Sequence, residues 1–95
     1  MSSPVAIARR LRISGRVHGV GFRYALADEA RARKLSGWVR NRRDGTVEAV
    51  VAGPEGDVEA VIAWARRGPP AARVAGVAVE PATTDLSDFE IVSTV

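Results

Sequence analysis

The chain has 95 residues, with 14 Lys and Arg against 11 Asp and Glu, and a formal net charge of +3. A chain of this length forms one domain with a single modest core, so we treat residues 1–95 as one domain and expect residues 1–6 to be a flexible N-terminus. There is no cysteine and only one histidine, which excludes disulfides, thiolate metal sites and multi-histidine metal centres. We therefore expect no metal and no cofactor.

No apolar run approaches the ~20 residues that cross a membrane. Arg9, Arg10 and Arg12 also interrupt the N-terminal segment before the apolar core of a signal peptide could form. We therefore expect a cytoplasmic protein without membrane contact. The positive charge suits anionic ligands, although an arginine-rich composition is equally typical of a protein from a G+C-rich genome.

Apolar side chains recur with two different periods along the chain. Alternation of apolar and polar residues over 7–14 predicts a half-buried strand, and apolar residues four apart from Phe22 predict a helix over 22–34. The pair Asp44-Gly45 favours a hairpin turn. After the hairpin, Gly53-Pro54 opens a second helix, which Gly68-Pro69-Pro70 ends. The predicted strands are residues 7–14, 37–42, 46–52, 73–80 and 89–92.

The resulting order of elements is strand, helix, hairpin, helix, strand and a short final strand. A β-α-β-β-α-β order is typical of the split βαβ, or ferredoxin-like, arrangement. The sequence thus predicts an α+β sandwich with an antiparallel sheet, two helices on one face and a short extra C-terminal strand. In such a sheet the first and second strands flank the third.

A glycine-rich loop joins the first predicted strand to the first helix. Glycines can adopt positive φ and carry no side chain, so successive N–H groups can point into one concavity at the positive end of the following helix. Arg23, in the first turn of that helix, would add a planar fork suited to phosphate oxygens. The spacing fits neither a dinucleotide fingerprint nor a Walker A site, and a tight turn without a ligand remains the alternative. The loop residues are Gly15, Arg16, Val17, His18, Gly19, Val20 and Gly21.

The second predicted strand carries an amide side chain among arginines. Asn41 stands where β-branched residues are more usual, which makes it a candidate site residue. The alternative is that Asn41 only helps to end the strand before the turn.

Together these segments resemble the two signature motifs of the acylphosphatase family. The matching residues run from Gly15 to Arg23, then from Gly37 to Asn41, and continue with Asp44-Gly45-Thr46-Val47-Glu48. The resemblance covers almost the whole chain, and the two motifs together are highly specific. It implies a hydrolase (EC 3.6.1.7) that cleaves the carboxyl-phosphate bond of an acyl phosphate by attack of water, releasing inorganic phosphate.

The resemblance also implies roles for individual residues. Arg23 would bind the phosphate, the backbone amides from about Gly15 to Gly21 would form the cradle, and Asn41 would position the attacking water. An amide suits that task because it offers both an acceptor and a donor without adding negative charge. His18 departs from the family's usual glutamine, and we interpret it as a tolerated, solvated loop residue.

Other polar and aromatic residues have simpler interpretations. We expect Trp38 and Trp64 to be packing residues rather than stacking platforms. The remaining arginines of the hairpin and four carboxylates are expected to lie on the surface or in turns. These residues are Arg40, Arg42, Arg43, Asp28, Glu29, Asp44 and Glu48.

Two other functions share this predicted topology. A nucleic-acid-binding module is the main rival, but such modules stack bases on aromatics of the two central strands, and residues 8–14 and 46–52 contain none. A phosphate-sensing domain without turnover is the third possibility, because a fold does not settle activity. We expect a monomer that acts on small acyl phosphates and binds no nucleic acid.

Overall fold

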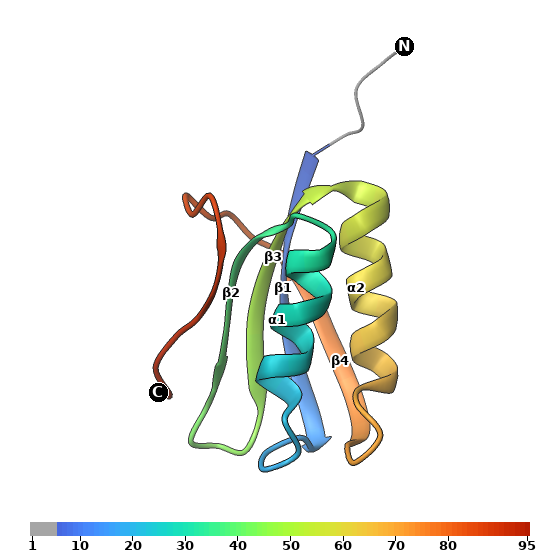
Figure 1. The fold of residues 1–95 in the computed structure, drawn as a ribbon. Helices are drawn as coiled ribbons and strands as arrows, with labels where there is room; N and C mark the ends of the chain where they lie inside the picture. The colour runs from blue at the N-terminus through green and yellow to red at the C-terminus, as the bar shows by residue number, and fades with distance from the viewer. Residues whose placement is uncertain (1–5) are drawn as a thin grey trace.

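A computed structural model describes residues 6–95. Seven elements follow one another in the predicted order (Figure 1). The expected flexibility of residues 1–5 lies outside the described residues, whereas Ala6 already belongs to the first strand and is paired with Pro54. The elements are β1 (Ala6–Arg16), α1 (Phe22–Ala32), β2 (Ser36–Asn41), β3 (Val47–Pro54), α2 (Glu55–Arg67), β4 (Arg73–Pro81) and β5 (Phe89–Ile91).

The five strands form one sheet in the order β4-β1-β3-β2-β5. Both helices cover the same face of this sheet, as expected for a ferredoxin-like sandwich (Figure 1). As predicted, β1 and β2 flank β3. The short strand β5 runs parallel to β2, so the sheet is mixed rather than wholly antiparallel. The chain reverses after β4 and crosses to the far edge, and this reversal gives β5 the direction of β1 and β2.

The core lies between the sheet and the helices. Leu11 and Ile13 of β1 are fully buried, and they alternate with Arg10 and Arg12 on the open face. The same alternation in β3 turns Val47 towards the core. The helices contribute two buried stripes, which consist of Phe22, Leu26, Ala27 and Ala30 in α1 and Val58, Val61, Ile62 and Ala65 in α2.

Helix α1 ends at Ala32, two residues before its predicted end. Lys34 adopts a left-handed backbone conformation with φ 57°, which no helix can continue. Its N–H and that of Leu35 donate to the carbonyl oxygens of Arg31 and Ala30, at 3.0 and 2.9 Å. These bonds satisfy the last carbonyl groups of the helix and turn the chain into β2.

Neither helix of the described residues has the length and apolar character needed to cross a bilayer.

Candidate active site

The loop between β1 and α1 is shaped by glycines, as predicted. Gly15, Gly19 and Gly21 have φ values of 116°, 70° and 75°. Gly21 is the N-cap of α1 and uses no side chain to cap it. In the described chain, no backbone carbonyl accepts a hydrogen bond of ordinary geometry from the N–H groups of residues 18–21. These donors lie beside the positive end of the α1 dipole, which is the environment that favours an anion.

A hollow of about 170 Å³ lies against this loop. Arg23 and Asn41 both line it, although they are 18 positions apart and come from different elements. Asn41 reaches it because it is the last residue of β2 and its partner in β3, Val47, is buried in the core. The residues that line the hollow are Val17, Gly19, Gly21, Phe22, Arg23, Tyr24 and Asn41.

The other residues of the predicted phosphate cradle lie at the margins of the hollow. Gly15 and Arg16 belong to β1 and pair with Val74 and Arg73 of β4, after a bulge at Ser14/Gly15. A side chain on Gly15 would collide with the Arg73 backbone, so this position requires glycine for packing as well as for its φ. Val20 packs against the core cluster rather than lining the hollow.

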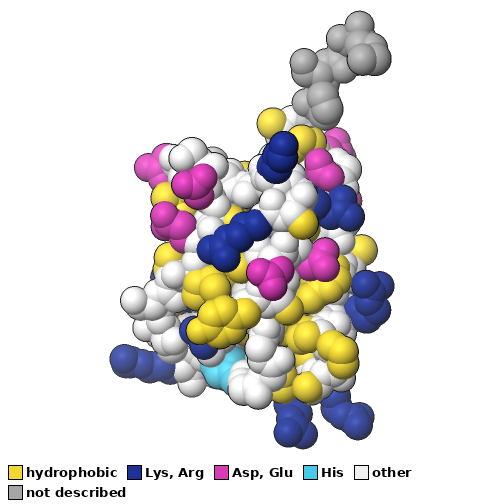
Figure 2. Space-filling model, viewed as in Figure 1, with side chains coloured by type: hydrophobic (Ala, Val, Ile, Leu, Met, Phe, Trp, Pro, Cys, Tyr) yellow, Lys and Arg dark blue, Asp and Glu magenta, His cyan; other side chains and the backbone are white. Residues whose placement is uncertain are grey.

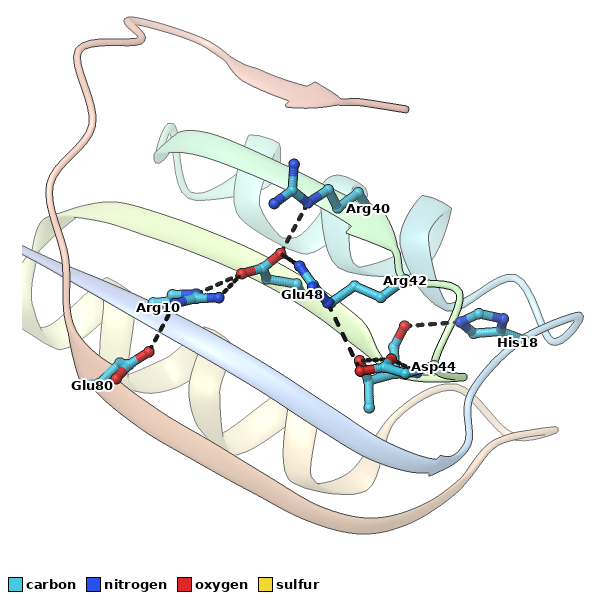
Figure 3. Close-up of polar contacts among 8 residues, drawn as sticks. Arg10, His18, Arg40, Arg42, Asp44, Glu48 and Glu80 are labelled. Carbon is cyan, nitrogen blue, oxygen red and sulfur yellow. Dashed lines mark hydrogen bonds and ion pairs between the residues drawn. The ribbon is translucent and has the colours of Figure 1, made fainter. Parts of the chain in front are cut away.

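His18 connects the loop to the β2–β3 hairpin. Its Nε2 lies 2.8 Å from the carbonyl oxygen of Thr46 (Figure 3). A carbonyl oxygen only accepts hydrogen bonds, so Nε2 carries the proton and donates it. The side chain is half-buried, so His18 is less solvated than expected, and its hydrogen bond was not predicted. The contact spans 28 positions, and no local pattern in the sequence indicates it.

The electrostatics favour an anion at this end of the molecule. On the face seen in Figure 2, the lower end, where the β1–α1 loop lies, carries Lys and Arg side chains and no acidic one. Among residues 6–95, Arg23 forms no salt bridge with an Asp or Glu. The Arg23 guanidinium lies 5.7 Å from the ring centroid of Tyr24. Tyr24, like Phe22, lines the hollow without having been predicted as a site residue, and its only signal in the sequence is its place beside Arg23 in the first turn of α1.

One of the carboxylates that we expected at the surface is buried instead. Glu48 is 1% exposed and lies on the open face of the sheet, where Arg10, Arg40 and Arg42 surround it (Figure 3). Arg40 and Arg42 are therefore ion-paired rather than a simply solvated strand face. Asp44 is exposed in the turn, as expected, and hydrogen bonds from the side chain and backbone of Thr46 hold its pKa below the usual range.

The two tryptophans pack, as expected. Trp64 meets Phe22 edge to face, with 5.5 Å between the ring centroids. Trp38 lies under the Arg40 guanidinium at 4.6 Å. Neither residue lines the hollow.

Residues 6–95 contain no cluster of three or more His, Cys, Asp or Glu side chains that could hold a metal ion. The positive charge near the hollow comes from Arg23 and from backbone N–H groups.

Comparisons with known proteins identify the family of this chain. The acylphosphatase family model matches residues 9–91. The acylphosphatase of Azoarcus sp. is 53% identical over 88 residues, covering 92% of this chain and 90% of the relative, and that of Rhodopseudomonas palustris is 58% identical over 80 residues, covering 84% and 81%. The crystal structure of acylphosphatase from Bacillus subtilis superposes with a TM-score of 0.86 at 38% identity, covering 93% of this chain and 99% of that one. The chain therefore belongs to the acylphosphatase family, whose members hydrolyse acyl phosphates.

Proposed function

We propose that this chain hydrolyses acyl phosphates at the hollow beside the β1–α1 loop, with Arg23 binding the phosphoryl group and Asn41 positioning the water. The observation that carries this assignment is that Arg23 and Asn41 line one small hollow together with Gly19 and Gly21 of the loop. An acyl phosphate is already activated, so the enzyme mainly has to hold its phosphoryl oxygens and direct a water in line.

Binding begins with the phosphoryl oxygens. The N–H groups of residues 18–21 and the N-terminus of α1 face the anion, and the guanidinium of Arg23 contacts two oxygens at once. These donors are fixed before the substrate arrives, so they stabilise the charge that develops in the transition state without reorganisation. No metal ion is needed for this task, and we propose that the reaction is metal-independent.

The chemical step is a displacement at phosphorus. The oxygen of the water forms a bond to phosphorus while the bond from phosphorus to the acyl oxygen breaks, and the bonding pair leaves with the carboxylate. Asn41 accepts a hydrogen bond from the water and donates one to a phosphoryl oxygen. The proton lost by the water ends on the phosphate product. No side chain is the nucleophile, and the carboxylate leaving group requires no general acid.

The experiment that tests this assignment separates the two residues by role. Arg23→Ala should raise the inhibition constant of inorganic phosphate and also lower kcat, because its contacts exist in both the ground state and the transition state. Asn41→Ala should leave that inhibition constant near wild type and lower kcat by about 10²-fold or more. Both constants are measured with benzoyl phosphate on purified, folded variants.

Three outcomes contradict the proposal. An active Asn41→Ala enzyme, or an Arg23→Ala enzyme that binds phosphate unchanged, would show that the roles are wrongly assigned. Activity that disappears with a chelator and returns with a divalent ion would contradict metal independence. Phosphate binding without turnover would favour the phosphate-sensing alternative.

We also propose that the protein acts in the cytoplasm as a monomer, on small acyl phosphates and without nucleic acid. The central strands β1 and β3 carry no aromatic side chain on which a base could stack. On the open face, Arg10, Arg40 and Arg42 are already paired with Glu48, which reduces their attraction for a polyanion. Sedimentation equilibrium tests the monomer, and a salt titration of RNA binding tests the absence of nucleic-acid binding. Submicromolar, sequence-selective binding of RNA would contradict the latter.

A further inference from the structure

The site hollow has an exposed aromatic ring at its border. Tyr24 is 62% exposed, which is more than any other large hydrophobic residue among those described. A single exposed apolar residue is ordinary on a protein surface and needs no explanation. Tyr24 differs because it also lines the hollow that holds Arg23 and Asn41.

The hollow is small, so the phosphoryl group and the acyl group of an acyl phosphate must bind in different places. Its volume of about 170 Å³ is below the roughly 300–1,000 Å³ that encloses a drug-sized ligand. The polar loop and Arg23 suit the phosphoryl group, so the acyl group, which is bonded to a phosphoryl oxygen, must extend to the border. Of the apolar side chains there, Val17 and Phe22 are each 1% exposed and belong to the core. Tyr24 alone among the lining residues offers a large exposed apolar surface.

The ring is held in a defined position. Tyr24 belongs to the first turn of α1, so its backbone is fixed by the helix, and the Arg23 guanidinium lies 5.7 Å from the ring centroid. A cation at this distance is attracted to the aromatic face. One aromatic contact to a flat apolar group is favourable, whereas a methyl group covers little of the ring.

We propose that Tyr24 forms the acyl-group subsite and makes this chain favour acyl phosphates whose acyl group is flat and apolar over those with a small aliphatic group. This inference rests on the proposed function, because it assumes that the phosphoryl group binds beside Arg23. The alternative is that the ring only orients the Arg23 guanidinium. In that case Tyr24 would affect every acyl phosphate equally.

The test compares two substrates in one enzyme. We expect Tyr24→Ala to lower the ratio of kcat/KM for benzoyl phosphate to kcat/KM for acetyl phosphate by about three- to tenfold, the range expected for one aromatic contact. Tyr24→Phe should retain the ratio, because it keeps the ring. Val79→Ala is the matched control, since Val79 is also an exposed apolar residue (39%) but lies in β4, outside the hollow.

The outcomes distinguish this inference from the proposed function. A wild type that hydrolyses neither substrate would contradict the function itself. An equal loss on both substrates in Tyr24→Ala, with a raised phosphate inhibition constant, would show that the ring only orients Arg23. An unchanged ratio in a folded Tyr24→Ala enzyme would overturn the subsite.

Discussion

Two regions of this molecule, one on each face of the sheet, use arginine in different ways. On the open face, Arg10, Arg40 and Arg42 surround the carboxylate of Glu48, which is almost completely buried. On the helix-covered side, Arg23 lies at the hollow and forms no salt bridge with an acidic side chain of residues 6–95. The chain supplies the anion in the first region, so those arginines stabilise the fold. In the second region the arginine remains available to a ligand.

The two regions also differ in how the backbone contributes. In the open-face cluster, Arg10, Arg40 and Glu48 lie on regular strands whose N–H groups are used in the sheet, and Arg42 directly follows β2, so only side chains hold the carboxylate. The hollow is bordered by a glycine-rich turn and a helix N-terminus, where backbone donors are available. A fixed internal carboxylate needs the first arrangement, and a transient phosphoryl group needs the second.

The largest effect should come from changing the arginine of the hollow. We expect Arg23→Lys to lower kcat/KM for benzoyl phosphate by about 10²-fold, because an ammonium cannot reproduce the two parallel hydrogen bonds of the fork. Arg10→Lys, on the open face, is the control and should change kcat/KM less than threefold. Comparable losses in both variants would remove the functional distinction between the two regions.

The next effect concerns stability. Glu48→Gln removes the central charge and leaves three neighbouring arginines without their shared carboxylate. We expect the free energy of unfolding to fall by about 1–3 kcal/mol, less than for a fully buried pair because the arginines are partly exposed. Glu80→Gln is the control, since its ion pair with Arg10 is exposed and should contribute less than about 1 kcal/mol. Urea denaturation at pH 7 measures both values, and equal losses would contradict the special role of Glu48.

The same cluster should respond to acid. Burial raises the pKa of Glu48, but hydrogen bonds from Arg42, Arg40 and Arg10 outweigh burial, and the pKa lies below its usual range. A carboxyl with a lowered folded-state pKa contributes stability above its unfolded pKa, and this contribution is lost as the pH falls through the folded value. Below about pH 4.5, wild type should therefore lose stability faster than Glu48→Gln. Parallel curves from pH 6 to pH 3 would show that the cluster does not depend on ionised Glu48.

The smallest effect should come from the hydrogen bond that connects the loop to the hairpin. His18→Ala removes the donor to the Thr46 carbonyl oxygen and should raise the phosphate inhibition constant about two- to tenfold, the value of one hydrogen bond. His18→Gln keeps a donor and should fall between wild type and His18→Ala. A His18→Ala enzyme with an unchanged constant would show that the loop holds its shape alone.

Local patterns predicted the elements because a buried stripe or an alternating strand is encoded within a few residues. The fold class follows from the order of those elements, and the roles of Arg23 and Asn41 come from the family resemblance. The burial of Glu48 could not be predicted from a local pattern. Alternation assigns Glu48 to the open face, but it does not indicate which side chains cover that face. Arg10, which helps to cover it, is 38 positions away in the sequence. The direction of β5 was missed for a similar reason, because it depends on where residues 82–88 carry the chain.

The two edge strands of the sheet affect whether copies of this chain associate at high concentration. An edge strand presents unpaired N–H and C=O groups that can template pairing with another molecule. At one edge, β5 has only three residues and offers a short template. At the other edge, the nine-residue strand β4 begins with Arg73 and ends with Glu80 and Pro81, so charge and a missing donor oppose a continuous ladder. The middle of β4, around Val77, is thus the part of the sheet most exposed to strand addition. Val77 itself packs against the core, so a charge that guards against self-assembly would have to stand at its exposed neighbour Ala78.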